Sequence, residues 1–190
     1  MAFEAQERAI ELVRDTMAPL REPFIAAMRL VPTAVSVITT DGPAGRFGVT
    51  VSALASVSAD PPMLLTCINF RSPACAAIRG NGVFTVNLLS EAQSHVADCF
   101  AGRATSGDHP AFDFGCASWT SDIACSAPRL EDAVAAFHCE VDHAHRAATH
   151  MVFIGRVIAA RSTGAPALAY VAQDYARISK LSETALNVRN

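Results

Sequence analysis

Short extended segments separated by turn residues occupy most of the chain after residue 33, and they constrain its fold more than any other feature. Residues 34–40 and 47–51 are rich in β-branched side chains and flank the turn sequence Asp41-Gly42-Pro43-Ala44-Gly45. Further strands are expected at 56–59, 63–68, 83–89 and 167–171, and a long hairpin is expected to pair 134–146 with 151–161 across a turn near 147–149. The pattern predicts a mainly β protein, built as a small antiparallel β-barrel with helices around it.

Helical periodicity is confined to the start of the chain and to two short segments. Between residues 3 and 31 apolar side chains recur every three or four positions and share one face: Ile10, Val13, Met17, Leu20, Phe24, Met28 and Val31. Pro19 and Pro23 interrupt this pattern, so two helices with a bend are expected. Their apolar face could cover a partner subunit, but the chain's own core is the default expectation. Short helices are also expected from residue 72 to about 81 and over 91–100, followed by loops over 101–128.

Composition narrows the class of protein. The 190 residues suffice for one domain, and an apolar fraction of 51% with 17% charged residues excludes intrinsic disorder. The formal net charge of −3 leaves no basic excess for a nucleic-acid backbone. No apolar run approaches the roughly 20 residues that span a bilayer. Acidic residues at 4, 7, 11 and 15 argue against a secretory or transit peptide.

Cysteine and lysine usage add two constraints. The six cysteines, at 67, 75, 99, 116, 125 and 139, form no Cys-x-x-Cys pair and lie mostly in apolar stretches. They are typical of reduced, buried thiols in a cytoplasmic protein. The single lysine, Lys180, lies near the carboxyl end, which argues against a Schiff-base or phosphate-loop lysine.

The stretch Cys67-Ile68-Asn69-Phe70-Arg71-Ser72-Pro73 places the end of a strand against the start of a helix. Ser72 is expected at the N-cap, where its hydroxyl accepts from an exposed backbone N–H, and Pro73 at the first helical position. The remaining N–H groups and the helix dipole form a potential anion site beside Asn69 and Arg71. The alternative is a plain helix cap with nothing bound.

Hydroxyl side chains recur at even spacing in the stretch 48–59. Thr50, Ser52, Ser56 and Ser58 would share one side of an extended chain, and Val49, Val51, Ala53, Ala55 and Val57 the other. Small side chains on such a strand would let a flat ring approach the backbone. The alternative is an amphipathic strand whose hydroxyl face is solvated.

Three histidines are expected on the long hairpin: His143 and His145 on one face, and His150 at the start of the second strand. They permit a metal site, but no Glu or Cys partner follows at a suitable spacing. One histidine that donates to a carboxamide or phosphate is favoured. The chain lacks Gly-x-Gly-x-x-Gly after a strand, Gly-x-Ser-x-Gly and His-Glu-x-x-His, the signatures of doubly wound dinucleotide folds, α/β-hydrolases and zinc peptidases.

Several stretches, taken in order, resemble the short-chain flavin reductases, the small NAD(P)H:flavin oxidoreductases that supply two-component monooxygenases. They are residues 34–40, 48–54, 56–58, 60–62, 67–69 with Ser72, 81–82, 86–87, 100–102 and 150–157. The resemblance implies an FMN-binding split β-barrel, usually a homodimer with flavin near the subunit interface. It also implies a single domain over 1–190, with a helical extension at 1–23 and a split-barrel core at 24–178.

The resemblance assigns roles to particular positions. Thr50, Val51, Ser52, Ala53 and Leu54 would line the isoalloxazine ring. Ser56, Asn69 and Ser72 would hold the ribityl chain or phosphate. Cys67 and Ile68, on the strand that leads to Asn69, are also expected to bind the cofactor. Phe100 and Ala101 would border the ring or the adenylate, and Tyr170 matches a late family aromatic. His150, the expected catalytic residue, would meet the nicotinamide nucleotide. Ala148-Thr149-His150 stands where the family usually has Gly-Asp-His.

The expected function is therefore NAD(P)H-dependent reduction of free flavin, FMN or FAD, by hydride transfer between stacked rings. NADH or NADPH would be the donor, and the reduced flavin would pass to a partner monooxygenase. Two alternatives stay open: a flavin-binding barrel without reductase turnover, such as an electron carrier or sensor, and a barrel enzyme with a metal held by the three histidines.

Overall fold

The computed structural model describes residues 19–103, 109–122 and 125–180. Its strands are β1 (Thr33–Ala34), β2 (Ser36–Thr40), β3 (Phe47–Val51), β4 (Leu54–Ala59), β5 (Pro62–Asn69), β6 (Val83–Leu88), β7 (Trp119–Asp122), β8 (Cys125–Leu130), β9 (Ala135–Ala147), β10 (His150–Ser162), β11 (Leu168–Val171) and β12 (Asp174–Arg177). Its helices after residue 33 are α2 (Pro73–Asn81), η1 (Glu91–Gln93), α3 (Ser94–Phe100) and η2 (Phe114–Cys116). The mainly β fold expected from the sequence is confirmed.

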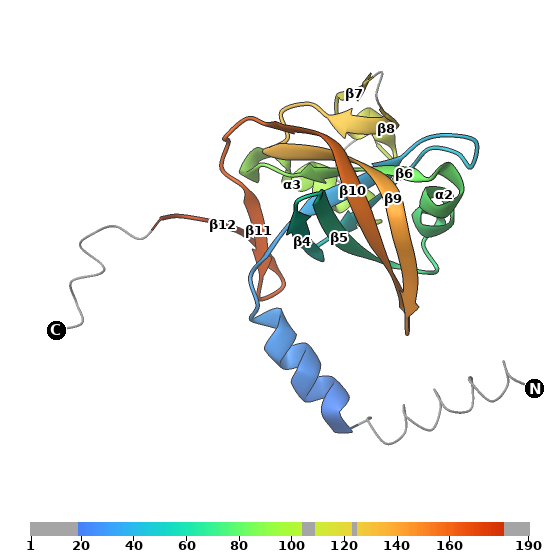
Figure 1. Cartoon of the computed structure of the whole chain (residues 1–190). Coiled ribbons are helices and arrows are strands. Elements are labelled where there is room, and N and C mark those ends of the chain that lie inside the picture. Colours follow the sequence, from blue (N-terminus) through green and yellow to red (C-terminus); the bar gives the residue numbers. More distant parts are fainter. Residues whose placement is uncertain (1–18, 104–108, 123–124, 181–190) are drawn as a thin grey trace, which may run out of the picture.

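Seven strands form one antiparallel sheet in the order β3-β2-β6-β9-β10-β5-β4. The two edge strands, β3 and β4, are consecutive in the chain and are joined by Ser52 and Ala53 alone. So short a linker requires the two edges to meet, and the backbone N–H of Cys67 in β5 donates to the carbonyl of Ala53 at 3.4 Å. The sheet therefore curls into a barrel, crossed in front by the long β9–β10 hairpin (Figure 1).

This closure corrects the expectation that the hydroxyls of residues 48–59 share one side of a single extended chain. The chain leaves one sheet edge after Val51 and joins the opposite edge at Leu54, with a register shift between Ser56 and Ser58. The hydroxyls of Thr50 and Ser56 therefore belong to different edges of the sheet.

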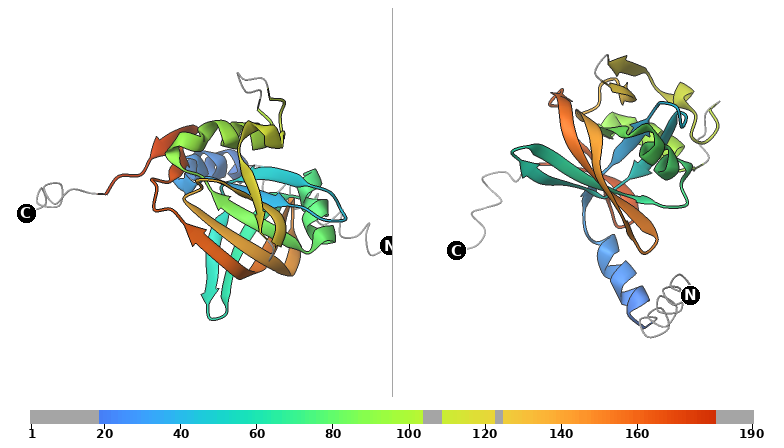
Figure 2. Two further views of the ribbon diagram at one scale, coloured as in Figure 1. Left: turned by 90° about the horizontal axis from the view of Figure 1, so that it is seen from above. Right: turned by 45° about the vertical axis from the view of Figure 1, so that its right-hand side comes forward.

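The sheet separates two hydrophobic clusters. The cluster inside the barrel contains Ile38, Leu64, Ile68, Phe84, Val86 and Phe153, among others, while Val37, Leu89, Val96, Phe100 and Leu130 belong to the second cluster, under α3. All five residues of β2 are buried, because neighbouring side chains enter opposite clusters. Helix α2 packs on β2, β3 and β6, and α3 on β2 and β3 (Figure 2).

Two asparagines that contributed to the family resemblance have structural contacts. The buried Asn87 donates to the carbonyl of Val37 and to the hydroxyl of Thr39, and its side-chain oxygen accepts from the N–H of Leu130 at 2.7 Å. Asn81, at the end of α2, accepts from the N–H of Ala44 and so holds the turn between β2 and β3. These residues fix the strands from which the cavities described below are built.

The N-terminal region differs from the expectation. Residues 19–29 form one helix that runs through Pro23, while Pro19 is the first described residue and the segment before it lies outside the described range. Leu20, Phe24 and Met28 are 58%, 65% and 47% exposed. The default expectation that this apolar face covers the chain's own core is therefore wrong for these residues, and the helix stands apart from the barrel (Figures 1 and 2).

Other expected elements agree closely, with three exceptions. β3 and the start of α2 at Pro73 match the expected residues, and the hairpin turns one residue later in its first strand. Strands β7 and β8 lie where loops were expected, and β12 follows β11 across a turn at Ala172 and Gln173. Within the described residues, no helix is long and apolar enough to cross a membrane.

Gly155 is expected to be needed for barrel packing. A Cβ there would lie 2.5 Å from Cζ of Phe84 and 2.9 Å from Cβ of Cys139, both fully buried. Replacing Gly155 with alanine should therefore lower the free energy of unfolding by about 1–3 kcal/mol, measured by urea denaturation. Ser162→Ala, at the exposed end of the same strand, is the control and should change it by less than about 0.5 kcal/mol. Equal stabilities would contradict the packing argument.

Candidate flavin site

Two adjoining cavities lie where β3 meets the helices. The larger, of about 490 Å³, is lined by Arg46, Phe47, Gly48, Val49, Thr50, Ser72, Pro73, Ala74, Phe100, Ala101 and Phe112. The smaller, of about 190 Å³, is lined by Val35, Thr50, Val51, Ser52, Ala101, Arg103, Tyr170 and Tyr175. Thr50 and Ala101 line both cavities, so one elongated ligand could extend across the two.

The larger cavity ends at the N-terminus of α2. Ser72 occupies the N-cap and Pro73 follows, as expected, but the Ser72 side chain makes no capping hydrogen bond, which corrects that part of the expectation. The N–H of Cys75 is satisfied by the carbonyl of Ser72 at 2.9 Å. Ser72 and Arg46 line the same cavity as the positive end of a helix dipole, and the Arg46 guanidinium carbon lies 4.1 Å from the centre of the Phe114 ring. This donor set suits an anionic group such as a phosphate.

Small residues and aromatic rings line the middle of the site. Gly48 is buried against Phe100: a Cβ at Gly48 would lie 2.5 Å from Cε1 of that ring. Phe100 is fully buried and packs edge-on against Phe114 and Trp119, with ring centroids 5.0 and 5.5 Å apart. Ala101, the C-cap of α3, is exposed beside them. These side chains leave room for a planar ring against the backbone of β3.

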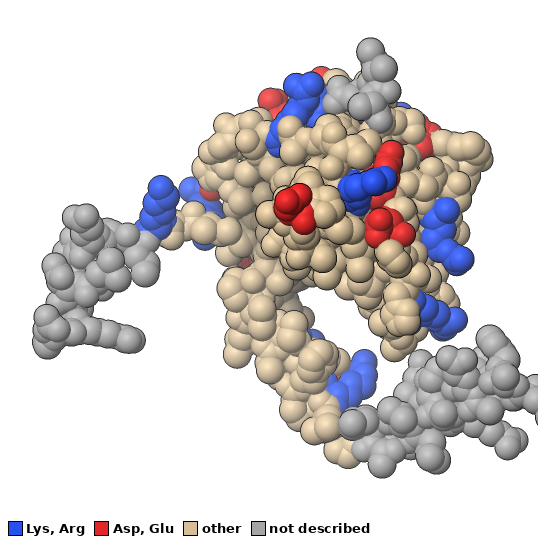
Figure 3. All heavy atoms as spheres, in the orientation of Figure 1, with Lys and Arg blue, Asp and Glu red and all other residues tan. Residues whose placement is uncertain are grey.

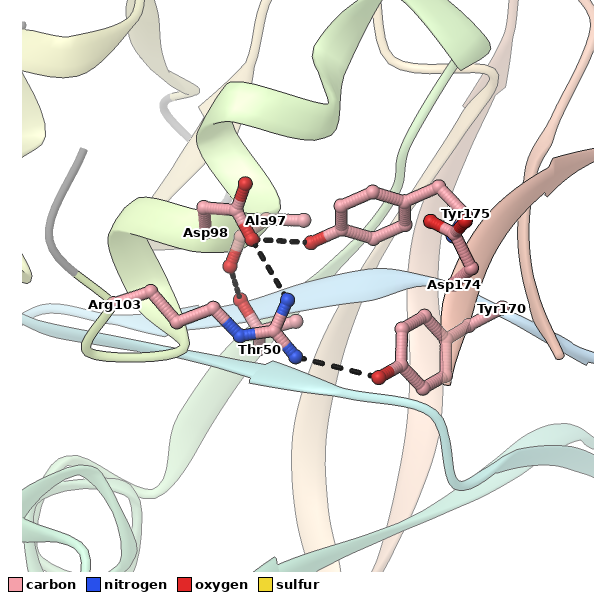
Figure 4. A network of polar contacts seen from close by, with 7 residues as sticks. All are labelled: Thr50, Ala97, Asp98, Arg103, Tyr170, Asp174 and Tyr175. Atoms are coloured by element: carbon pink, nitrogen blue, oxygen red, sulfur yellow. Dashed lines mark hydrogen bonds and ion pairs between the residues drawn. The ribbon is translucent and has the colours of Figure 1, made fainter. Parts of the chain in front are cut away.

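A polar network borders the smaller cavity (Figure 4). The Arg103 guanidinium donates to Asp98 at 3.0 Å and to the Tyr170 hydroxyl at 3.4 Å. The Tyr175 hydroxyl donates to the same Asp98 oxygen at 2.8 Å. Burial, and then this hydrogen bond, raise the pKa of Tyr175, so its proton stays in place. The network thus joins α3 to the β11–β12 hairpin.

The chain reverses sharply to bring Arg103 into this network. After α3 ends, Gly102 takes a left-handed φ of 75°, and the N–H of Arg103 donates back to the carbonyl of Asp98 at 3.1 Å. The hydrogen bond to Tyr170, followed by weaker effects of Tyr175 and Asp98, raises the pKa of Arg103. Arg103 is therefore a permanent cation at the rim of the smaller cavity.

Seven of the residues expected to bind flavin line these two cavities: Thr50, Val51, Ser52, Ser72, Phe100, Ala101 and Tyr170. Leu54 and Ser56 line a separate apolar cavity of about 320 Å³, with Met63, Phe137 and Val157. None of the described cavities is lined by Ala53, Cys67, Ile68, Asn69 or His150. The side chain of Ile68 points instead into the barrel core.

His150 and Asn69 lie opposite each other where β10 pairs with β5. His150 is exposed, and its Nδ1 lies 2.9 Å from the Thr149 hydroxyl. The carbonyl of Asn69 accepts from the N–H of Ser72 at 2.9 Å, so the pair lies next to the α2 end of the larger cavity. Ala148 takes a φ of 49°, a conformation that favours glycine, at the position where the family usually has glycine.

The three hairpin histidines do not form a metal cluster. His143 and His145 are exposed on β9, and Nδ1 of His143 contacts Asp142. Among the residues that the structure describes, no three His, Cys, Asp or Glu side chains are placed to hold a metal ion.

Sequence reasoning missed Arg46, Gly48, Asp98, Arg103 and Tyr175 as parts of this site. Gly48 is the first residue of the matched stretch 48–54 but was assigned no role, and Arg103 directly follows the matched stretch 100–102. Tyr175 lies in β12, which was not expected at all, and Asp98 is unremarkable within its helix. Their association is visible only in the folded chain.

Comparisons with known proteins show the family to which the chain belongs. The family model for the flavin reductase like domain matches residues 28–179. The FMN reductase (NADH) RutF of Methylorubrum extorquens strain DSM 6343 is 38% identical over 175 residues, which cover 92% of this chain and 80% of that protein.

Two solved structures extend the comparison. NADH:FAD oxidoreductase SgcE6 of Streptomyces globisporus C-1027, in complex with NAD and FAD fragments, has a TM-score of 0.74 and 26% identity and covers 84% of this chain and 93% of its own. The styrene monooxygenase flavin reductase of Pseudomonas putida S12 has a TM-score of 0.70 and 27% identity. The match covers 82% of this chain and 97% of that one. The fold is thus the split barrel of the flavin reductases, and the chain belongs to the flavin reductase family.

Proposed function

We infer that the protein is an NAD(P)H:flavin oxidoreductase that reduces free FMN or FAD and supplies the product to a partner monooxygenase. The observation that carries this inference is the pair of adjoining cavities, one ending in a phosphate-type donor set at α2 and the other walled by small residues and tyrosines. The donor set and the small side chains fit a flavin. Bound flavin would supply the hydride acceptor, its N5 atom.

The protein's own residues would bind and orient the two substrates. Thr50, Val51 and Ser52 would hold the ring plane against β3, with Ala101 and Tyr170 at its border. Ser72 and the first free N–H groups of α2 would bind the phosphate. Five further residues remain proposed contacts of the flavin: Ala53 in the connection before β4, Leu54 and Ser56 in the edge strand β4, and Cys67 and Ile68 in the neighbouring strand β5. Binding of this kind would orient the flavin ring toward the nicotinamide, and hydride transfer depends mainly on that orientation.

His150 is proposed to act at the nicotinamide side, next to Asn69, which stays a proposed contact of the flavin ribityl chain or phosphate. The support is the pairing of the two residues at the strand ends beside Ser72, together with the family position of His150. A neutral imidazole can donate a hydrogen bond to a carboxamide and accept one as well. His150 would therefore position the nucleotide and take no proton from it.

The direct test is nicotinamide oxidation. Purified protein is mixed with NADH or NADPH and with FMN, FAD or riboflavin, and the loss of nicotinamide absorbance is followed. Turnover with at least one flavin is expected. Flavin binding without turnover under all combinations would favour the binding module or electron carrier instead.

The phosphate site yields a sharper prediction. FMN should bind at least tenfold more tightly than riboflavin, since charge-assisted hydrogen bonds contribute about 1.5–3 kcal/mol each. Ser72→Ala should weaken FMN and leave riboflavin nearly unchanged. Because the hydroxyl makes no capping bond, the free energy of unfolding should change by less than about 0.5 kcal/mol. Fluorescence titration and urea denaturation measure both. Equal FMN and riboflavin affinities of the unmodified protein would place the phosphate elsewhere.

A homodimer is part of the proposal. Two features support it: the exposed apolar helix face with Leu20, Phe24 and Met28, and the apolar cavity formed by β4, β5, β9 and β10. On the face shown in Figure 3, much of the helix surface carries no Lys, Arg, Asp or Glu. Isolated apolar faces of this kind mark interaction surfaces.

Sedimentation of the unmodified protein should give twice the chain mass of 20.0 kDa. Phe24→Glu, which places a charge on the apolar face, should shift the protein toward the monomer. Arg21→Glu, a charge change at an exposed position of the same helix, is the control. A monomeric unmodified protein at micromolar concentration with flavin present would contradict this part.

A cytoplasmic location completes the proposal. No disulfide joins any of the six cysteines, all of which lie in the part of the chain that the structure describes. Burial raises the pKa of Cys139 to about 12, which makes that thiol a poor nucleophile. A reducing compartment would keep all six in this form.

A further inference from the structure

We propose that Arg103 is the residue that compensates the negative charge of reduced flavin, and that Asp98 holds Arg103 in place and moderates its effect. This inference rests on the proposed function and concerns a part of the site to which the family resemblance assigned no role. Hydride transfer carries two electrons and one proton from the nicotinamide C4–H bond to flavin N5. The nicotinamide leaves as a cation, and the flavin gains one negative charge on its pyrimidine ring unless it takes a second proton from solvent.

The lining of the smaller cavity shows which residue could meet that charge. Its lining residues are apolar, hydroxyl-bearing or aromatic apart from Arg103. Thr50, Val51, Ser52, Ala101 and Tyr170, the residues proposed to contact the ring, line the same cavity. A ring bound there lies against the one charged side chain among these lining residues.

Arg103 is held in a defined position at the cavity rim. Its Nη1 and Nη2 atoms donate to Asp98 and Tyr170, and its guanidinium carbon lies 5.9 Å from the centre of the Tyr170 ring. A guanidinium has five N–H donors, so these two contacts leave donors for a carbonyl oxygen or a ring nitrogen of a ligand. The side chain is 53% exposed, which limits the strength of any charge interaction by solvent screening.

The Asp98 carboxylate has an opposite charge in the same network. It accepts from both Arg103 and Tyr175 and is 32% exposed. Removing Arg103 would leave this carboxylate beside the cavity, whereas removing the carboxylate charge would leave the cation uncompensated. Substitutions of the two residues should therefore change the preference for reduced flavin in opposite directions.

The experiment compares binding of oxidised and reduced FMN, the latter under anaerobic conditions, with no nucleotide present. In Arg103→Gln, the affinity for reduced FMN relative to oxidised FMN should fall roughly three- to tenfold. The upper value corresponds to a decrease of about 30 mV in the two-electron potential of the bound flavin. Arg103→Lys should retain most of the preference, because it keeps the charge. Asp98→Asn should raise the preference.

Arg46→Gln is the matched control, because Arg46 lines the neighbouring cavity at its phosphate end. It should weaken FMN by the same factor in both oxidation states. Thermal melting of every variant identifies loss of folding, and Arg103→Lys preserves the test if Arg103→Gln does not fold.

An unchanged ratio in Arg103→Gln, or a shift of the same sign in Asp98→Asn, would overturn the inference. A variant that changes only the KM for NADH would assign Arg103 to the nucleotide and would also overturn it. If the unmodified protein binds neither form of flavin, the proposed function itself fails. If it reduces flavin and only the ratio is insensitive to Arg103, the proposed function stands and this inference alone is wrong.

Discussion

Replacing Phe100 with alanine is expected to lower the free energy of unfolding by about 3–5 kcal/mol. Phe100 is fully buried, packs edge-on against Phe114 and Trp119, and lies against Gly48 in β3. Its removal opens a cavity between α3 and the sheet that no neighbour can fill without moving a strand. Because Phe100 also forms a wall of the larger cavity, flavin affinity should fall in parallel.

Phe112→Ala is the matched control for this prediction. Phe112 lines the same cavity, but it is 54% exposed and lies outside the buried aromatic cluster. Its free energy of unfolding should change by much less, within about 1 kcal/mol. Urea denaturation of the two variants provides the comparison. Equal losses in both would show that the aromatic cluster does not stabilise the barrel.

The largest kinetic effect is expected from His150→Ala. Loss of one hydrogen bond to a bound polar group costs about 1–3 kcal/mol. The value of kcat/KM for the nicotinamide nucleotide should therefore fall roughly five- to hundredfold, while the flavin dissociation constant changes little. Steady-state kinetics at saturating flavin and a flavin titration measure the two quantities.

His145→Ala controls for a general effect on the hairpin. His145 is exposed on β9, and its register partner on β10 is Val152, two residues from His150. Both kinetic and binding constants should stay near those of the unmodified protein. A collapse of flavin binding in His150→Ala with intact nucleotide kinetics would show that the histidine contacts the flavin.

Local pattern predicted the barrel strands well where turn residues delimit them. The turn at residues 41–45 and the apolar run in β5 are signals carried by adjacent residues. Strands β7 and β12 were missed because segments such as Trp119–Asp122 and Asp174–Arg177 are short and contain few β-branched residues. They are strands because their partners β8 and β11 are available for pairing.

Periodicity also failed at a specific place, the stretch 48–59. Alternation of hydroxyl and apolar residues continues through Ser52 and Ala53, although the chain changes sheet edge there. An alternating pattern predicts on which side of the backbone each side chain lies. It does not predict which strand pairs with that segment.

The two ends of the site differ in how far the sequence could reveal them. The donor set at α2 depends on contiguous residues around Ser72, so its place could be predicted, although its hydrogen bonding could not. The network of Asp98, Arg103, Tyr170 and Tyr175 joins residues up to 77 positions apart. No spacing rule relates such residues, and their contact depends on how β11 and β12 lie against α3.

The two-residue connection between β3 and β4 has a consequence for the stability of the protein against proteolysis in the cell. The residues proposed to contact the flavin ring lie on both sides of this connection, so a bound flavin would touch both edges of the sheet at the point where they meet. Binding at this point favours the closed barrel over any state in which the edges separate, and a ligand present at a hundred times its dissociation constant contributes about 2.7 kcal/mol. Release of the product to another protein removes that contribution. The resistance of the barrel to local opening, and hence to proteolysis, would then rise and fall with the supply of free flavin.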